Sequence, residues 1–187
     1  MRVIAGKFRS RPLRSLRRLD IRPTSDRLRE TLFDVLTAGN PQALQGSLWL
    51  DLFAGSGAVG IEAISRGAAI VYFVDSSKRA AELINANVES LGISDGFRIL
   101  QQPAFDAIRE LDHQQVKPHF IFLDPPYRSE DAYSETLERL GNSELAHRSL
   151  VVAEHARRFD TGEGFGFLRR IRKLDQGDAS LSFYRPE

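Results

Sequence analysis

From residue 48 onward, short apolar runs alternate with amphipathic segments, and this rhythm constrains the fold more than any other feature of the chain. Five runs have the length and composition of buried strands: 48–53, 70–75, 97–100, 120–124 and 150–154. The segments between them predict helices near residues 57–66, 77–91, 104–112 and 130–141. Strands that alternate with helices indicate βαβ units and a parallel sheet. The expected fold class is therefore α/β, doubly wound.

The first forty residues precede this rhythm. Residues 25–37 predict one amphipathic helix, because residues 22–26 have the pattern of an extended approach and a helix N-cap, and apolar residues then recur at helical spacing. The stretch 38–41, Ala-Gly-Asn-Pro, ends that helix. We therefore divide the chain into an extension, residues 1–40, and a main domain, residues 41–187.

The end of the chain changes rhythm again. Apolar and basic residues over 165–172 and mostly apolar residues over 181–184 flank a turn signal at 175–178. This pattern predicts a closing β-hairpin.

Basic charge gathers at the start of the chain. Residues 1–29 carry ten Lys and Arg against two Asp, a net charge of +8, which leaves −7 for the remaining residues. Nine of the ten are Arg, whose planar guanidinium suits bidentate contact with phosphate. A disordered basic tail or a localisation signal would carry the same charge, but the arginines are interleaved with apolar residues, which indicates short ordered strands packed on the domain. These apolar residues are Val3, Ile4, Ala5, Phe8, Leu13, Leu16, Leu19 and Ile21. We favour a nucleic-acid-binding extension.

Composition excludes several classes of chemistry and of location. The chain has no cysteine, so disulfides, thiolate metal sites and a cysteine nucleophile are excluded. Its four histidines show no metal-ligand spacing, and no metal is expected. No apolar run approaches the roughly 18 residues of a membrane helix, and no signal-peptide pattern stands at the start. We expect a cytoplasmic protein without a membrane partner.

A glycine-rich turn follows the first strand of the main domain. Gly55, Gly57 and Gly60 stand as G-x-G-x-x-G between a strand and a helix, where glycines let the backbone approach a ligand and leave the helix N-terminus facing it. A nicotinamide or flavin enzyme would show the same glycines, and a tight turn without a ligand would use some of them. The pattern favours a cofactor site without naming the cofactor.

Asp75 ends the next strand. At that position a carboxylate can accept hydrogen bonds from both hydroxyls of a ribose. The alternative is an N-cap for the helix that starts near Ser76, and the two roles can coexist.

The tetrapeptide Asp124-Pro125-Pro126-Tyr127 follows the fourth strand, at the sheet edge where open α/β folds bind ligands. The prolines remove two N–H donors, so the Asp124 carboxylate and the Pro125 carbonyl present acceptors to a bound NH₂ group. These acceptors can orient the exocyclic amino nitrogen of a base as it attacks a methyl sulfonium, and Tyr127 offers a face for the base to stack on. The alternative is a Pro-Pro turn with an acidic N-cap.

These residues resemble the Rossmann-like class I methyltransferases that act on amino groups. Four blocks in order are similar to the RsmD family, and the match covers nearly the whole chain: residues 2–7, residues 22–33, residues 51–60 with 62 and 65–68, and residues 120–127. The resemblance implies a doubly wound, mostly parallel seven-stranded sheet with an antiparallel last strand and a small basic N-terminal extension that helps to hold RNA. It implies S-adenosyl-L-methionine as cofactor and methylation of the N2 amino group of one guanine in 16S ribosomal RNA.

The resemblance also assigns the site residues. The residues expected to bind the cofactor are Asp51, Phe53, Ala54, Gly55, Gly57, Gly60, Asp75, Ser76, Ala104 and Asp124. The catalytic residues are expected to be Asp124, Pro125, Pro126 and Tyr127. The residues expected to contact RNA are Lys7, Arg9, Arg11, Arg22, Thr24, Arg27 and Arg29. Class I methyltransferases often place an Asp or Asn after the third strand to accept from adenine, but here Pro103 stands there. Recognition of adenine is left open among Gln102, the Ala104 N–H and Asp106.

Three other functions compete with this one. A DNA adenine or cytosine amino-methyltransferase would share the tetrapeptide but usually has a larger target-recognition region. A dehydrogenase would leave Asp124–Tyr127 without a role. A non-catalytic RNA-binding assembly factor should have lost the glycine loop or the tetrapeptide, and both are intact. We expect a monomer whose partner is 16S rRNA within the assembled or assembling small ribosomal subunit.

Overall fold

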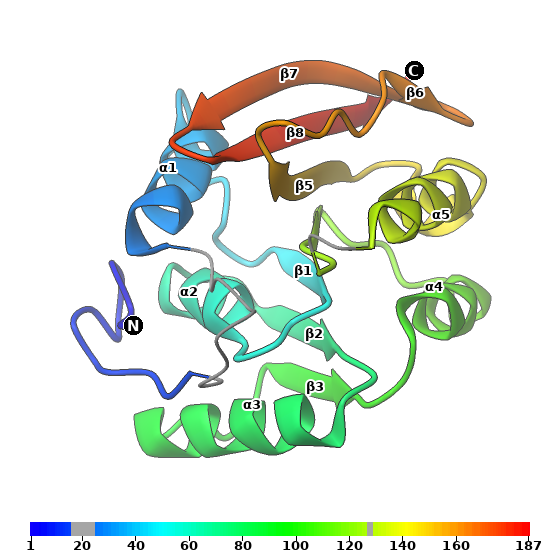
Figure 1. The fold of residues 1–187 in the computed structure, drawn as a ribbon. Helices are drawn as coiled ribbons and strands as arrows, with labels where there is room; N and C mark the ends of the chain where they lie inside the picture. Colours follow the sequence, from blue (N-terminus) through cyan, green and yellow to red (C-terminus); the bar gives the residue numbers. More distant parts are fainter. Residues whose placement is uncertain (16–24, 127–128) are drawn as a thin grey trace.

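The computed structural model describes residues 1–15, 25–126 and 129–187, and it is built on one eight-stranded sheet with the strand order β3-β2-β1-β4-β5-β8-β7-β6 (Figure 1). The strands are β1 (Leu48–Leu52), β2 (Ile70–Val74), β3 (Phe97–Leu100), β4 (Phe120–Leu123), β5 (Leu150–Ala156), β6 (Gly164–Phe165), β7 (Leu168–Gln176) and β8 (Ala179–Pro186). The helices are α1 (Asp26–Thr37), α2 (Ala58–Ser65), α3 (Lys78–Leu91), α4 (Ala104–His113) and α5 (Glu130–Gly141), with a 3₁₀ turn at Glu144–Ala146. The five strands and five helices expected from the periodicity are confirmed.

The direction of the strands follows the connections between them. β1 to β5 pair in parallel, because a helix or longer crossover joins each to the next. β8 pairs antiparallel with β5 and β7, as the expected hairpin and the antiparallel last strand require. The sheet has eight strands where seven were expected. The additional strand is β6, whose two residues are too short to give a strand pattern in the sequence.

Two hydrophobic clusters cover the two faces of the sheet. One contains apolar residues of α1, α2 and α3, and the other contains those of α4 and α5, which Figure 1 shows on opposite sides. Neighbouring residues of one strand alternate between the clusters, as Trp49 and Leu50 do, because side chains of a strand point to opposite faces. The ends of the parallel strands are thereby fixed at one edge of a packed core.

The first fifteen residues, called here the N-terminal segment, form an ordered loop beside α2 and α3 (Figure 1). The expectation of short strands is wrong for these residues, whose only bridge pairs Arg2 with Pro12. Buried Val3 and Leu13 do pack into the cluster of α1, α2 and α3, as their apolar character predicted. Leu16, Leu19 and Ile21 lie outside the described residues. The proposed division at residue 40 stays a prediction.

β7 and β8 form a two-stranded ribbon, called here the C-terminal ribbon. Its turn places Gly177 at φ 61°, a conformation that glycine adopts without strain. The register between the strands shifts between Arg170 and Arg172, and Ile171 at this bulge is 58% exposed. Among the helices of the described residues, none is both long and apolar enough to cross a membrane.

Candidate active site

The glycine loop, residues 53–57, leaves the carboxyl end of β1 and leads into α2. Gly57 is the N-cap of α2 at φ 76°. A Cβ on Gly60 would collide with the side chains of Phe73 and Val71, so this glycine lets α2 pack directly on β2. Phe53 also has a positive φ, 62°, which is uncommon for a residue with a bulky side chain. The loop therefore holds a strained backbone at the sheet edge where a ligand is expected.

Asp51 lies beneath this loop on β1. Its carboxylate is 2% exposed and accepts a hydrogen bond of 2.9 Å from the backbone N–H of Gly60. Burial raises the pKa of Asp51 to about 7, against the opposing effect of the Gly60 N–H, and the charge of Asp75 adds to the increase. Asp51 therefore titrates near neutral pH, where a nearby cation would favour its ionised form.

Asp75 follows β2 and faces the glycine loop. One carboxylate oxygen accepts from the Gly55 N–H at 2.9 Å, and the other accepts from the Ser77 N–H at 2.9 Å. The N-cap of α3 is Ser77, not Asp75, because the Ser77 hydroxyl accepts from Ala80. A carboxylate has about four acceptor positions, so Asp75 retains capacity for a ligand hydroxyl while it holds the loop. Ser76 beside it is exposed.

Asp124 begins the loop after β4. Leu123 pairs with Leu52, so Asp124 and Phe53 follow neighbouring positions of adjacent strands. The loop that begins with Asp124, Pro125 and Pro126, called here the acceptor loop, therefore lies next to the glycine loop. Asp124 is partly exposed, Pro125 is buried and Pro126 is exposed. Tyr127 lies outside the described residues. The structure thus brings together the described parts of the two loops that the sequence singled out.

Tyr133 is a site residue that the sequence reasoning missed. It comes from α5, it is 1% exposed, and its hydroxyl donates to the Pro125 carbonyl oxygen at 3.2 Å. That carbonyl has a second lone pair, which leaves it able to accept from a substrate. A tyrosine on an apolar helix face reads as core in the sequence, and only the fold shows where its hydroxyl points.

The three candidates for adenine recognition, Gln102, the Ala104 N–H and Asp106, lie at or near the start of α4. The Gln102 side-chain amide donates to Glu110 at 2.8 Å, and the Asp106 carboxylate accepts from Arg109 at 3.0 Å. Both side chains therefore already have a partner. Ala104 is buried at the first position of α4, where a backbone N–H has no acceptor within its own helix.

The described residues that were expected to contact RNA differ in exposure. Lys7, Arg9, Arg11 and Arg27 are exposed, and Arg11 donates to the Ser90 carbonyl near the end of α3. The expectation for Arg29 is wrong. Its side chain is 0% exposed and donates hydrogen bonds to the Arg2 carbonyl and to the Asp26 carboxylate. A nucleic acid therefore cannot reach the guanidinium of Arg29. Arg22 and Thr24 lie outside the described residues.

Two further buried residues fasten the N-terminal segment to the site. Glu62 of α2 is 0% exposed and accepts from the N–H groups of Ile4 and Ala5 at 2.7 and 2.9 Å. Asn87 of α3 accepts from the Arg14 N–H at 2.9 Å, and donates to the Arg14 carbonyl at 3.1 Å and to the Ser56 carbonyl at 2.9 Å. The sequence offered one signal for Glu62, because it is a single charged residue within the apolar run 58–65. A charge on a buried helix needs partners, so this Glu could have been expected to bind other groups of the protein.

Within the described ranges, no group of three or more His, Asp or Glu side chains is arranged to hold a metal ion. The site instead offers backbone N–H groups, the carboxylates of Asp51, Asp75 and Asp124, and the Pro125 carbonyl. Such a set suits an organic ligand with hydroxyl and amino groups.

The sheet order and the placement of these loops define a class I methyltransferase fold. A solved structure titled "Putative methyltransferase yhhF from Escherichia coli" shares it with a TM-score of 0.81 and 28% sequence identity, covering 100% of this chain and 98% of that one.

The family described as Conserved hypothetical protein 95 matches residues 1–185, and the chain belongs to this family, the RsmD family that its motifs resemble. The chain is 32% identical over 186 residues to "Putative rRNA methyltransferase YlbH" of Bacillus subtilis, covering 99% of this chain and 98% of that protein. It is 36% identical over 160 residues to "Ribosomal RNA small subunit methyltransferase D" of Haemophilus influenzae, covering 82% and 78%.

Proposed function

We propose that this protein transfers a methyl group from S-adenosyl-L-methionine to the exocyclic N2 amino group of one guanine in 16S rRNA of the small ribosomal subunit. The observation that carries the proposal is the pair of acceptors, Asp124 and the Pro125 carbonyl, beside the glycine loop at the carboxyl edge of the sheet. The names of the relatives support rRNA of the small subunit as the substrate. The choice of guanine N2 rests on the resemblance of the four sequence blocks.

The residues around the glycine loop fit the proposed cofactor. Asp75 would accept from the ribose hydroxyls, since it keeps free acceptor positions beside its bonds to Gly55 and Ser77. Gly55 and Gly57, with Asp51 beneath them, would lie around the methionine part, together with Phe53, Ala54 and Gly60. Ser76 and Ala104 would complete the site towards the adenine. When bound, the cofactor supplies an electrophilic methyl group.

The acceptor loop would hold the target nitrogen. Asp124 and the Pro125 carbonyl each accept one hydrogen of the amino group, which orients the nitrogen and favours the positive charge that develops on it. Tyr133 fixes the direction of the Pro125 carbonyl by its hydrogen bond, and Pro126 stiffens the turn. Tyr127 would stack on the flipped or unpaired base. After transfer the nitrogen loses a proton to Asp124 or to water.

The test is incubation with methyl-labelled S-adenosyl-L-methionine and, separately, naked small-subunit RNA, assembled small subunits and DNA from cells that lack this activity. Digestion then identifies the modified nucleoside. Label in N2-methylguanosine is the expected result. Label in a DNA base would move the protein to the amino-methyltransferases of DNA, and cofactor binding without label on any of them would favour a non-catalytic assembly factor.

Asp124→Ala tests the role of the acceptor loop. Turnover should fall about a hundredfold or more, because one of two groups that favour the developing charge is lost, while cofactor affinity changes little. Asp131→Ala is the matched control, since Asp131 is an exposed carboxylate on α5. Strong turnover by Asp124→Ala would overturn the assigned role.

The pH dependence of cofactor affinity tests the role of Asp51. Because the pKa of Asp51 is raised to about 7, the carboxyl is largely protonated below that pH, and binding of a cationic cofactor must displace the proton. Affinity measured by calorimetry should therefore increase as pH rises towards 7 and then level off. Asp51→Asn should remove this dependence, and a wild-type affinity that is flat between pH 5 and 8 would contradict the placement.

A further inference from the structure

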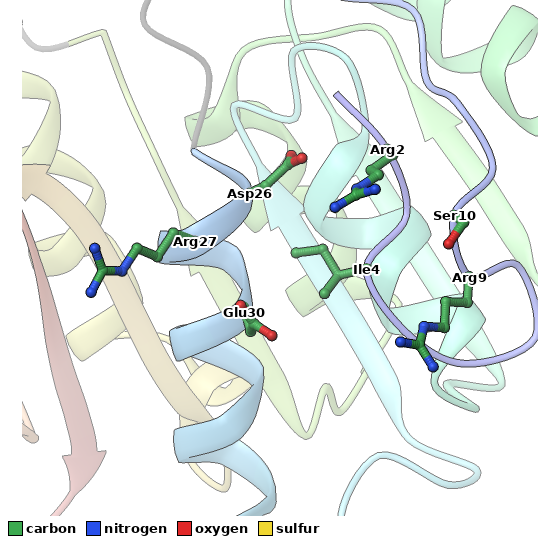
Figure 2. Close-up of a pocket in the computed structure, with 7 residues that line it drawn as sticks. All are labelled: Arg2, Ile4, Arg9, Ser10, Asp26, Arg27 and Glu30. Carbon is green, nitrogen blue, oxygen red and sulfur yellow. The ribbon is translucent and has the colours of Figure 1, made fainter.

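A pocket lies between the N-terminal segment and helix α1, away from the acceptor loop. It is lined by Arg2, Ile4, Arg9 and Ser10 of the segment and by Asp26, Arg27 and Glu30 of the helix. Figure 2 shows Arg2, Ile4 and Arg9 extending from the segment towards α1, with Glu30 opposite them, while the guanidinium of Arg27 points away to the other side of the helix. The pocket therefore has two cations, Arg2 and Arg9, on the segment wall and two carboxylates, Asp26 and Glu30, on the helix wall.

Two buried charged residues, Arg29 and Glu62, hold the backbone of the segment wall of the pocket. Arg29 donates to the Arg2 carbonyl and to the Asp26 carboxylate, which fixes one residue of each wall. Glu62 accepts from the N–H of Ile4 and forms an ion pair with Arg29 at 3.8 Å. Such a frame restrains the pocket before any ligand arrives, which lowers the entropy lost on binding.

The segment wall also contains a tight turn that is closed by its own hydrogen bonds. Ser10 adopts a φ of 67°, its N–H donates to the Val3 carbonyl at 2.9 Å, and the Val3 N–H donates to the Arg11 carbonyl at 2.9 Å. Ser10 and Arg9 are therefore brought back beside Arg2 by the backbone itself.

The charges of the pocket do not neutralise one another. Within the described part of the chain, the guanidiniums of Arg2 and Arg9 and the carboxylate of Glu30 form no ion pair closer than 4.0 Å. The Asp26 carboxylate, in contrast, is paired with Arg29 at 3.0 Å. Two unpaired guanidiniums on one wall attract an anion, and an opposing carboxylate can accept from a donor on the same ligand.

We propose that this pocket binds one nucleotide of the substrate RNA at a distance from the methylated base. Arg2 and Arg9 hold its phosphate, and Glu30 accepts a hydrogen bond from the same nucleotide, either from the ribose 2′-hydroxyl or from a base amino group. Arg27 lies on the outer side of the helix, where it meets the adjoining backbone. The identity of the ligand as RNA rests on the proposed function.

The sign of the effect at Glu30 separates this inference from general attraction to a basic surface. On such a surface, removal of any carboxylate strengthens RNA binding, because repulsion of phosphate falls. If Glu30 accepts a hydrogen bond from the nucleotide, Glu30→Gln weakens binding instead, because the neutral amide oxygen of Gln accepts a hydrogen bond less strongly than a carboxylate does. Asp34→Asn is the matched control, since Asp34 is an exposed carboxylate one turn further along α1 and does not line the pocket.

The experiment measures filter binding of a transcript of small-subunit RNA to the full chain over a series of salt concentrations. Arg2→Ala and Arg9→Ala should each weaken binding about tenfold and reduce the salt dependence by about one phosphate contact. Arg148→Ala, an exposed arginine outside the pocket, is the control. Glu30→Gln should weaken binding about threefold to tenfold, while Asp34→Asn leaves it unchanged or strengthens it.

A DNA strand of the same sequence identifies the donor. If the penalty of Glu30→Gln disappears on DNA, the donor is the 2′-hydroxyl, and if the penalty persists it is a base amino group; either result supports the pocket. Stronger RNA binding by Glu30→Gln, or arginine variants that match Arg148→Ala, would overturn it. Because binding is read without catalysis, wild-type protein that binds RNA but transfers no methyl group would contradict the proposed function and leave this result intact.

Discussion

The N-terminal segment and the C-terminal ribbon both lie outside the five parallel strands, yet they are held in opposite ways. The ribbon is joined to the sheet by a continuous ladder in which β8 pairs with β5 on one side and with β7 on the other. The segment has a single isolated bridge within itself, and buried side chains of α2 and α3 bind its backbone. The position of the ribbon therefore depends mainly on its backbone, whereas the position of the segment depends on a few side chains.

The side chains that hold the segment belong to the elements that form the cofactor site. Glu62 lies on α2, which begins at the glycine loop, and Asn87 binds both the segment and the Ser56 carbonyl of that loop. A change at either residue disturbs the segment and the loop together. In the ribbon, by contrast, most single side chains can change without loss of the ladder.

Glu62→Ala should have the largest effect on this contrast. The carboxylate is 0% exposed, and it pairs with Arg66 at 2.7 Å and Arg29 at 3.8 Å. Within the described residues, its loss leaves Asp26 as the one ion-pair partner of the buried Arg29. Removal of one partner from a buried ion pair costs about 3–5 kcal/mol, so the free energy of unfolding in urea should fall by that amount.

Two further variants control this result. Glu82→Ala removes an exposed carboxylate 3.7 Å from Lys78 and should cost less than about 1 kcal/mol. If Glu62→Ala does not fold, Glu62→Gln keeps the volume and one acceptor and should lose less. A Glu62 variant as stable as Glu82→Ala would show that the segment is held by other contacts.

Asn87→Ala should have the second largest effect. The side chain is 0% exposed and makes three hydrogen bonds, two to Arg14 and one to Ser56, and buried groups left without partners cost about 1–3 kcal/mol. Hydrogen exchange should speed up in residues 1–15 and remain unchanged in β7 and β8. Asn85→Ala, an exposed asparagine on the same helix, is the control. Equal acceleration in the ribbon would contradict the separation of the two regions.

The same contrast explains how far the sequence could be interpreted. The parallel strands were predictable because each is an apolar run with a helix beside it, and the ribbon was predictable from its turn signal. Strands in the segment were expected from Val3 to Ala5, but Glu62 takes the N–H groups of Ile4 and Ala5 that a neighbouring strand would need. The prediction that Arg29 contacts RNA was wrong because Arg29 is buried, and a sequence does not distinguish a buried arginine from an exposed one.

The candidate site also contains residues that were predictable from the sequence and residues that were not. The glycine loop, Asp75 and Asp124 each follow a strand, so their place at the sheet edge was predictable from the topology. The residues that support the site were not predictable, because Asn87 and Tyr133 reach it from within helices and do not follow a strand. Their spacing matches that of apolar core residues, and the direction of one polar atom decides their role.

Asp160→Asn tests the loop between β5 and β6, which contacts the ribbon through Arg170, and it should lower the free energy of unfolding by less than the two changes above. Asp160 accepts a hydrogen bond of 2.5 Å from Arg170 of β7, and this bond lowers the pKa of Asp160 to about 2. Because the pKa in the folded state lies below the unfolded value of about 3.9, the stabilisation is complete above that value and is lost as the pH falls towards 2. The carboxylate is exposed, so the cost at pH 7 should be less than about 1 kcal/mol.

Unfolding in urea at pH 7 and at pH 2 measures the difference between Asp160→Asn and the wild type. The difference should be present at pH 7 and largely absent at pH 2. Asp95→Asn, an exposed carboxylate in the loop before β3, should match the wild type at both values. An equal cost of Asp160→Asn at both pH values would mean that packing, not charge, makes the contribution.

Ile171→Ser should have the smallest effect, although it replaces a large apolar side chain in the ribbon. Ile171 is 58% exposed at the bulge of β7, so the change in the free energy of unfolding should stay within about 0.5 kcal/mol. Leu168→Ala on the same strand is the matched comparison, because Leu168 is 0% exposed and its truncation should cost about 2–5 kcal/mol. A large cost at Ile171 would show that the bulge itself depends on this side chain, and the ribbon would then resemble the N-terminal segment in relying on particular residues.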